Sequence, residues 1–284
     1  MSYELIDGKL VASKIREEIK DRVAEIKNKH SRIPGLAAIL VGDDPASEIY
    51  VRNKRKACED VGIYSEEHKL SGDIAQEDLL KLINRLNGDE NINGILVQLP
   101  LPKHIDDSTV LNSVSPEKDV DGFHPINAGL LFEGKPRFIA CTPHGIIKML
   151  EFYNIDIEGK NAVVLGRSNI VGKPASMLLL QKNATVTICH SRTRNLDKIL
   201  KSADLIVAAI GRAKFVTPEM VKKGSVIIDV GINRLDDGKL VGDVDFENVK
   251  DISSYITPVP GGVGPMTITM LLWNTVSSLE QSVS

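Results

Sequence analysis

The chain has 284 residues and a formal net charge of −3, and 42% of its residues are hydrophobic. This length accommodates one large domain or two modest ones, and the near-balanced charge argues against a nucleic-acid or membrane-surface protein. No apolar run reaches the roughly 18 residues of a membrane helix, no signal peptide is evident, and the three distant cysteines fit neither a disulfide framework nor a zinc site. We therefore expect a cytoplasmic protein with reduced cysteines and with no metal, nucleic acid or membrane as a partner.

The first half of the chain alternates between helical and strand patterns. Apolar residues recur with the helical period in some segments and form short continuous runs, typical of buried strands, in others. Asp44 and Pro45 are suited to the N-cap and first turn of a helix. The predicted order is helix 9–29, strand 35–41, helix 45–61, strand 63–70, helix 75–87 and strand 94–99, followed by a loop-rich stretch with one short helix near 107–113.

The second half repeats a strand and a helix at regular spacing. A capped helix over 142–154 is followed by strands at 161–165, 184–189, 204–210 and 225–230 and by a last helix over 265–280. This βαβ rhythm predicts a parallel, doubly wound sheet of the Rossmann type. We expect an α/β protein of two domains flanking a cleft, one comprising residues 1–140 and the C-terminal helix 265–284, the other residues 141–264.

The loop after the predicted strand 161–165 resembles a dinucleotide-binding turn. It runs from Gly166 to Pro174 and contains Arg167, Ser168 and Gly172. Such a turn leaves backbone N–H groups free at a helix N-terminus, where they can bind a diphosphate. Ser168 replaces the middle glycine of the usual G-x-G-x-x-G motif and the last glycine is shifted, so the loop also fits a plain tight turn. The βαβ spacing around it favours the dinucleotide site.

The end of the next predicted strand lacks the acid that NAD enzymes use. An Asp or Glu about 20 residues after the glycine loop usually accepts a hydrogen bond from the ribose 2′-OH. Ser191, Arg192 and Arg194 occupy this region instead, with Arg167 in the glycine loop. Arginine binds a 2′-phosphate through charge-assisted hydrogen bonds. The sequence therefore predicts NADP rather than NAD, the alternative being that these arginines are merely solvated.

The predicted helix 45–61 carries a lysine in the middle of its apolar face. On a helical wheel, Lys54 lies at the centre of the arc formed by the small and apolar side chains, four residues after Tyr50. An amphipathic helix rarely places a cation there. Lys54 could extend past its neighbours to water, or it could face a cleft and serve as a base or proton donor beside Tyr50.

Three further segments fit a cleft. Gln98 lies at the carboxyl end of a predicted strand, where ligands of open α/β sheets gather, although it could also simply face solvent. Asp119 and Asp121 alternate in a loop, and their carboxylates could accept from an amino-pyrimidine ring or share a metal, for which further ligands are lacking. The loop 258–265 is stiffened by prolines and made approachable by glycines, which suits either a flat ligand or an interdomain hinge.

Taken together, these segments resemble the bifunctional methylenetetrahydrofolate dehydrogenase/methenyltetrahydrofolate cyclohydrolase family. Five motifs in the same order are far more specific than any one of them, and they extend from residue 6 to about residue 270. The matching segments are Asp44 to Ser47 with Tyr50, Val51 and Lys54; Gln98 to Pro102; Pro116 to Gly122; Gly166 to Ser168 with Val171 to Pro174; and Pro260 to Thr267.

The resemblance implies a homodimer with NADP on the second domain and the folate between the two domains. It assigns catalysis to Lys54, assistance to Gln98 and binding of the pterin ring to Asp121, with Tyr50 beside them. The NADP contacts it implies are Gly166, Arg167, Ser168, Ser191 and Ile232, to which the residue patterns add Gly172 and Arg192. The substrate contacts are Tyr50, Lys54, Gln98, Asp121, Pro260, Gly261, Gly262 and Val263.

The implied chemistry has two steps. The methylene bridge of 5,10-methylenetetrahydrofolate loses hydride to NADP, and water then opens the methenyl product to 10-formyltetrahydrofolate. The first step demands mainly positioning, whereas the second needs proton transfers that a lysine could carry. Three alternatives remain: an NADP dehydrogenase without cyclohydrolase activity, a dehydrogenase for a hydroxy acid or a shikimate-like substrate, and a non-catalytic NADP-binding regulator. The last two leave the lysine, glutamine and aspartate segments unexplained.

Overall fold

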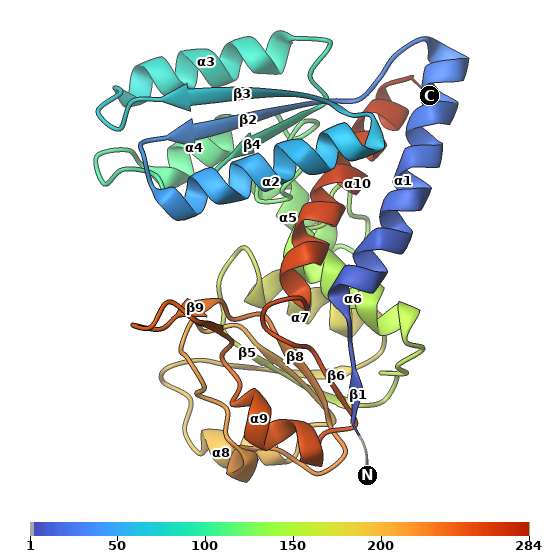
Figure 1. Cartoon of the computed structure of the whole chain (residues 1–284), viewed down its shortest axis with the longest axis vertical. Coiled ribbons are helices and arrows are strands. Elements are labelled where there is room, and N and C mark those ends of the chain that lie inside the picture. The colour runs from blue at the N-terminus through green and yellow to red at the C-terminus, as the bar shows by residue number, and fades with distance from the viewer. Residues whose placement is uncertain (1–2, 284) are drawn as a thin grey trace. The chain divides into compact units, whose positions relative to one another are not determined.

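The computed structural model describes residues 3–283 and divides into two compact units. Residues 14–141 and 268–283 form the three-stranded unit, and residues 3–13 and 142–267 form the six-stranded unit, each named after its main sheet. Within the described residues, no helix is both long enough and apolar enough to cross a membrane. Figure 1 shows the elements of both units.

A short parallel sheet in the order β3-β2-β4 forms the centre of the three-stranded unit. The strands are β2 (Gly35–Val41), β3 (Tyr64–Leu70) and β4 (Gly94–Val97). Every residue of β2 and β4 is buried, whereas the edge strand β3 is largely exposed or half-buried, which explains why β2 and β4 read as continuous apolar runs. The predicted strands of this half are confirmed, within two residues at each end.

Helices cover both faces of this small sheet. The helices of this unit are α2 (Pro45–Val61), α3 (Gln76–Gly88), α4 (Asp107–Ser113) and α5 (Pro125–Phe132), together with most of α1 (Gly8–His30) and of α10 (Val263–Val283). Alternate β2 residues, Ala37, Ile39 and Val41, form one core with α3 and α4, and α2 lies on the opposite face from α3 (Figure 1).

The ends of α2 follow from local sequence chemistry. The Asp44 carboxylate accepts from the Ser47 N–H at 2.8 Å, Pro45 occupies the first turn, and Gly62 closes the helix in the left-handed conformation at φ 82°. The predicted N-cap is therefore confirmed. Helix α5 was not predicted, because only eight residues form it and two of its large apolar side chains, Ile126 and Phe132, are exposed. Such a segment has no amphipathic period to read.

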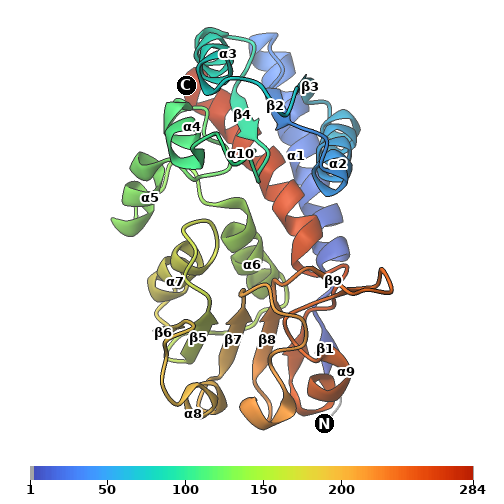
Figure 2. The same cartoon turned by 90° about the vertical axis from the view of Figure 1, so that its left-hand side faces the viewer.

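The six-stranded unit is built on a parallel sheet in the order β1-β11-β8-β7-β5-β6. Its main strands are β5 (Asn161–Leu165), β6 (Thr185–Cys189), β7 (Leu205–Ala208) and β8 (Val226–Asp229), which lie side by side in Figure 2. Its helices are α6 (Cys141–Phe152), α7 (Gly172–Gln181), α8 (Leu196–Lys201) and α9 (Phe246–Val249), with 3-10 turns at Pro218–Met220 and Lys250–Ile252. A hairpin of β9 (Asn233–Arg234) and β10 (Leu240–Val241) completes it. The predicted Rossmann-type parallel sheet is confirmed.

The N-terminal segment lies in a different unit from the one expected. Residues 3–13 were predicted to belong with the first domain, but β1 (Glu4–Leu5) pairs in parallel with β11 (Tyr255–Ile256) at the edge of the six-stranded sheet. The Ile6 N–H donates to the Ile256 carbonyl at 2.9 Å, and the Ile6 side chain is fully buried. A strand of two residues is too short to show a period, and its partner lies about 250 residues away in the sequence.

Candidate active site

The three-stranded unit buries Lys54 and pairs it with Gln98. Lys54 is only 8% exposed, although both of its sequence neighbours on α2 are exposed. Its Nζ donates to Gln98 Oε1 at 3.0 Å. Extension of the lysine to water, the alternative left open by the sequence, does not occur. Because the paired amine is buried, water screens its interactions with neighbouring charges less than it would at the surface.

Gln98 is oriented by its backbone and by its own amide. It directly follows β4, its N–H donates to the Ile39 carbonyl at 2.9 Å, and its side-chain Nε2 donates to the Leu99 carbonyl at 2.7 Å. With the amide nitrogen so engaged, the oxygen faces Lys54. The strand end thus presents an acceptor, as expected for the carboxyl edge of a parallel sheet.

Asp121 is the carboxylate that shares the electrostatic environment of Lys54. Loss of hydration raises the pKa of Asp121 to about 6, and the positive charge of Lys54 opposes this rise. The Cys141 thiol lies 3.9 Å from Asp121 Oδ1. Lys54 of α2, Gln98 just after β4 and Asp121 of a distant loop are therefore neighbours in one unit.

Asp119 has a different, structural environment. Its carboxylate accepts from the Phe123 N–H at 3.1 Å, from the His124 N–H at 2.8 Å and from Asn127 Nδ2 at 2.8 Å. It therefore fixes the turn that leads into α5, an environment that differs from that of Asp121. In the part of the chain that the structure describes, no group of three or more His, Cys, Asp or Glu side chains could hold a metal ion.

Tyr50, a predicted site residue, is less buried than Lys54. It is 38% exposed, so it lies at the surface one turn before the buried Lys54.

Asn274 belongs to this region and was not predicted. It is buried on α10, and its Nδ2 donates to the carbonyls of Val120 at 2.8 Å and Ile139 at 2.9 Å. It ties down the loop that carries Asp121, and a polar residue within the apolar run of the last helix was the signal for it.

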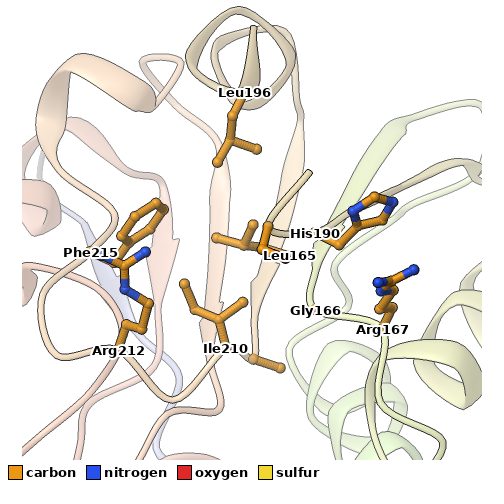
Figure 3. A pocket seen from close by; sticks show the side chains of 10 residues that line it. Leu165, Gly166, Arg167, His190, Leu196, Ile210, Arg212 and Phe215 are labelled. Atoms are coloured by element: carbon orange, nitrogen blue, oxygen red, sulfur yellow. The ribbon is translucent and has the colours of Figure 1, made fainter. Parts of the chain in front are cut away.

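The six-stranded unit holds a pocket of about 320 Å³ at the carboxyl ends of β5, β6 and β7. Figure 3 shows the side chains around it. The residues that line it are Leu165, Gly166, Arg167, His190, Ser191, Leu196, Ala209, Ile210, Arg212 and Phe215. A pocket at this edge of a parallel sheet is where a dinucleotide binds.

Two glycines of the loop are required by close backbone contacts. Gly166 has φ +126°, and a Cβ there would lie 2.2 Å from the Ala209 carbonyl oxygen. A Cβ on Gly172 would lie 2.2 Å from the Gly166 carbonyl oxygen. The Ser168 hydroxyl accepts from the N–H groups of Val171 at 3.1 Å and Gly172 at 3.3 Å, so it closes the turn. The glycines and Ser168 thus allow a tight turn from β5 into α7 beside this pocket.

The predicted cofactor residues occupy different places around this pocket. Gly166, Arg167 and Ser191 line it, whereas Ser168, Gly172, Arg192 and Ile232 are not among its lining residues. His190, Arg212 and Phe215 line it and were not predicted as ligands. Arg212 and Phe215 follow β7 directly after Gly211, and the residue types at these two positions gave no signal of a ligand role.

The loop predicted to contact substrate packs tightly within the six-stranded unit. Gly261 has φ +109°, and a Cβ on Gly8 would lie 1.8 Å from the Gly262 carbonyl oxygen. Val263 is 4% exposed and begins α10, and the Gly262 N–H donates to the Pro258 carbonyl at 2.9 Å. The glycines therefore serve close approach of the chain to itself at α1.

Two family models match the chain in succession. Residues 6–121 match the catalytic domain of tetrahydrofolate dehydrogenase/cyclohydrolase, and residues 140–283 match its NAD(P)-binding domain. The chain belongs to the tetrahydrofolate dehydrogenase/cyclohydrolase family. The family resemblance inferred from the five motifs is thus confirmed. It extends over both units, since the two matches together span most of the three-stranded and six-stranded units.

Individual members of this family are similar over nearly the whole chain. The bifunctional protein FolD of Bacillus mycoides (strain KBAB4) is 57% identical over 278 residues, covering 98% of this chain and 97% of that protein. The crystal structure of the FolD methylenetetrahydrofolate dehydrogenase/cyclohydrolase from Campylobacter jejuni has a TM-score of 0.97 at 53% identity, covering 99% of this chain and 100% of the other. The Trypanosoma brucei enzyme, complexed with NADP cofactor and inhibitor, has a TM-score of 0.96 at 39% identity, covering 100% and 99%.

Proposed function

We propose that the chain is a bifunctional enzyme of one-carbon metabolism. It oxidises 5,10-methylenetetrahydrofolate to the 5,10-methenyl form with NADP and hydrolyses that product to 10-formyltetrahydrofolate. The observation that carries this proposal is the buried Lys54–Gln98 pair beside Asp121, in a chain matched throughout by both domains of the family. A buried amine held by a neutral acceptor is suited to proton transfer.

In the first step, the residues of the three-stranded unit serve mainly to position the folate. The two nitrogens flanking the methylene carbon delocalise the charge left when hydride departs, so no strong base is needed. Bound NADP supplies the hydride acceptor. We assign Asp121 to the pterin ring, Tyr50 and Lys54 to the region of the reacting carbon, and the 260–263 loop to the substrate. Correct placement alone accounts for a large part of such catalysis.

In the second step, water adds to the methenyl carbon, the bond from this carbon to the ring nitrogen N5 breaks, and the net proton is released. Lys54 is the group suited to move protons between the water and the nitrogen, and Gln98 orients it through the 3.0 Å hydrogen bond. A hydrogen-bonded general acid or base usually contributes about 100- to 10,000-fold to a rate.

The six-stranded unit has the residues that NADP requires. Gly166 and Gly172 allow the tight turn from β5 into α7, the kind of turn at which a diphosphate binds, and Arg167 and Ser191 line the pocket at the β5 and β6 ends. We assign the 2′-phosphate to these two side chains, because a guanidinium binds phosphate by charge-assisted hydrogen bonds. Ser168, Gly172, Arg192 and Ile232 complete the proposed cofactor set.

A spectroscopic assay tests both activities at once. When methylenetetrahydrofolate and NADP are added to the purified protein, NADPH absorbance is expected to rise and any methenyl absorbance to decay. If NADPH formed but the methenyl signal did not decay, the protein would have only the dehydrogenase activity. If no NADPH formed, the proposal would be contradicted. Arg167→Ala is expected to lower kcat/KM for NADP by about 10-fold or more while changing that for NAD little.

Two further properties rest on the sequence analysis and not on the site. We propose that the protein acts in the cytoplasm and that it forms a homodimer. Light scattering coupled to size-exclusion chromatography of the purified chain, whose monomer mass is 31.0 kDa, tests the second proposal. A mass of one chain across the working concentration range would contradict it.

A further inference from the structure

One wall of the cofactor pocket is an arginine lying over an aromatic ring. The Cζ atom of Arg212 lies 4.5 Å from the centroid of the Phe215 ring. Phe215 is half-buried and packs against the core of the six-stranded unit, so the ring is a fixed support. Among the residues that the structure describes, Arg212 forms no ion pair with an acid. One face of its guanidinium therefore contacts Phe215, and the other face is available to a ligand.

The backbone that carries Arg212 is fixed by a buried carboxylate. Asp243 is fully buried, and its Oδ2 accepts from the N–H groups of Ile210 at 2.6 Å and Gly211 at 3.0 Å. Its Oδ1 accepts from the Arg212 N–H at 2.8 Å and from Asn233 Nδ2 at 2.9 Å. Four donors on one ionisable side chain hold this loop in a single position. The wall is therefore preorganised, which lowers the entropic cost of binding.

The rest of the pocket gives this wall a specific partner. Figure 3 shows Arg212 and Phe215 on one side and Arg167 and His190 on the other, with Ile210 and Leu165 between them. The space between the walls has an apolar floor and a guanidinium on each side, of which that of Arg212 lies over an aromatic ring. Guanidinium planes stack on flat heteroaromatic rings, while apolar side chains exclude water from beneath. Such a slot fits a purine ring better than a phosphate.

We propose that Arg212, supported by Phe215, stacks on the adenine ring of the bound nucleotide. This inference rests on the proposed NADP site and adds a ligand residue to it. Arg212 acts on the part that NADP and NAD share, whereas Arg167 on the opposite wall acts on the 2′-phosphate that only NADP has. The two arginines therefore have separable effects: Arg212 sets nucleotide affinity, and Arg167 sets the preference for NADP.

Equilibrium binding of NADP and of NAD, measured by calorimetry without folate, tests the assignment. Arg212→Ala is expected to raise Kd for both nucleotides by the same factor, about three- to thirty-fold, the range of cation–π contacts. Arg212→Lys keeps the charge without the plane and is expected to recover less than half of the lost affinity on a logarithmic scale. Arg167→Ala is expected to raise the NADP Kd far more than the NAD Kd. Arg234→Ala, an exposed arginine of the same unit, is the control and should change neither.

Other outcomes would overturn the assignment in distinct ways. If Arg212→Ala raised only the NADP Kd, Arg212 would be a phosphate ligand, and if it changed neither Kd, the residue would have no ligand role. Full recovery by Arg212→Lys would show that charge suffices and that stacking is absent. If the unsubstituted protein bound neither nucleotide, the proposed function itself would fail, and this inference with it. Thermal unfolding of each variant tests whether its substitution leaves the fold intact.

Discussion

At the scale of single residues, the most informative side chain is the buried amine of Lys54. Hydride transfer depends mainly on positioning, whereas opening of the methenyl ring needs protons to move. We therefore predict that Lys54→Met lowers the cyclohydrolase rate by about 100-fold or more and the dehydrogenase rate much less. Separate assays started from methenyl- and methylenetetrahydrofolate measure the two rates.

The same helix offers a matched control for Lys54. Lys56 is exposed on α2, two residues further along, and Lys56→Met should leave both rates close to those of the unsubstituted protein. If Lys54→Met and Lys56→Met behaved alike, the buried amine would have no part in proton transfer. Equal losses of both activities in Lys54→Met would instead point to a general role in holding the substrate.

Asp121 gives a prediction about pH. Because loss of hydration raises its pKa to about 6, this carboxyl already takes up a proton near pH 6, well above the usual range of aspartate. If the charged form binds the pterin ring, the folate KM should rise as the pH falls through about 6 and be constant above about 7. Asp121→Asn should raise the KM and remove this pH dependence, and Asp121→Ala should raise it further or stop both reactions.

Steady-state kinetics over a pH series, with folate as the varied substrate, measures this effect. Asp60→Ala, an exposed aspartate at the end of α2, is the control and should keep the pH profile of the unsubstituted protein. A folate KM in Asp121→Ala equal to that of the unsubstituted protein would make this carboxylate structural, like Asp119.

At the scale of elements, the carboxyl end of β8 depends on a buried acid. The Asp229 carboxylate accepts from the N–H groups of Gly231 at 3.0 Å and of Asp243 and Val244 at 2.9 Å each. Burial, together with the neighbouring Asp243 charge, raises the pKa of Asp229 from 3.8 to about 7, although the three backbone N–H groups oppose the rise. The folded chain therefore keeps this proton at a pH where the unfolded chain has lost it.

The sign of the resulting pH effect follows directly. The folded state binds more protons at Asp229 than the unfolded state between about pH 4 and 7, so stability from this group is complete below pH 4 and is lost as the pH rises to about 7. Asp229→Asn cannot titrate. The unfolding free energy of the unsubstituted protein minus that of Asp229→Asn is therefore predicted to fall over this range and then to level off. Urea titrations across the range measure it, and a constant difference would contradict the raised pKa.

Elements long enough to show a hydrophobic period, or beginning with a distinct cap, were predictable from the sequence. Very short elements were not. Strand β2 (Gly35–Val41) and helix α2 (Pro45–Val61) match the predicted bounds, because an apolar run and the Asp44–Pro45 start are local signals. Strand β1 and helix α5 escaped prediction. The first has only two residues, and the second has exposed apolar side chains that break the helical pattern.

At the scale of the whole molecule, the chain contributes to its two units in an order that sequence patterns do not show. Residues 3–13 join the six-stranded unit although about 130 residues of the other unit follow them. They do so through the hydrogen bonds of β1 with β11, which add one strand at the edge of the sheet. The sequence contains both strands, but the pairing depends on backbone groups that carry no residue-specific signal.

The sequence by itself determined the fold class, the family, the glycine turn and the residues Lys54, Gln98 and Asp121 as candidates, because periodicity, caps and ordered motifs are properties of neighbours along the chain. Only the tertiary structure decided which candidates meet. It joined Lys54 to Gln98 across 44 positions, separated Asp119 from Asp121 by giving the former three donors, and placed Arg212 and Phe215 in the cofactor pocket. Such contacts depend on how strands and helices pack, and packing brings together residues whose sequence separation carries no information about their distance.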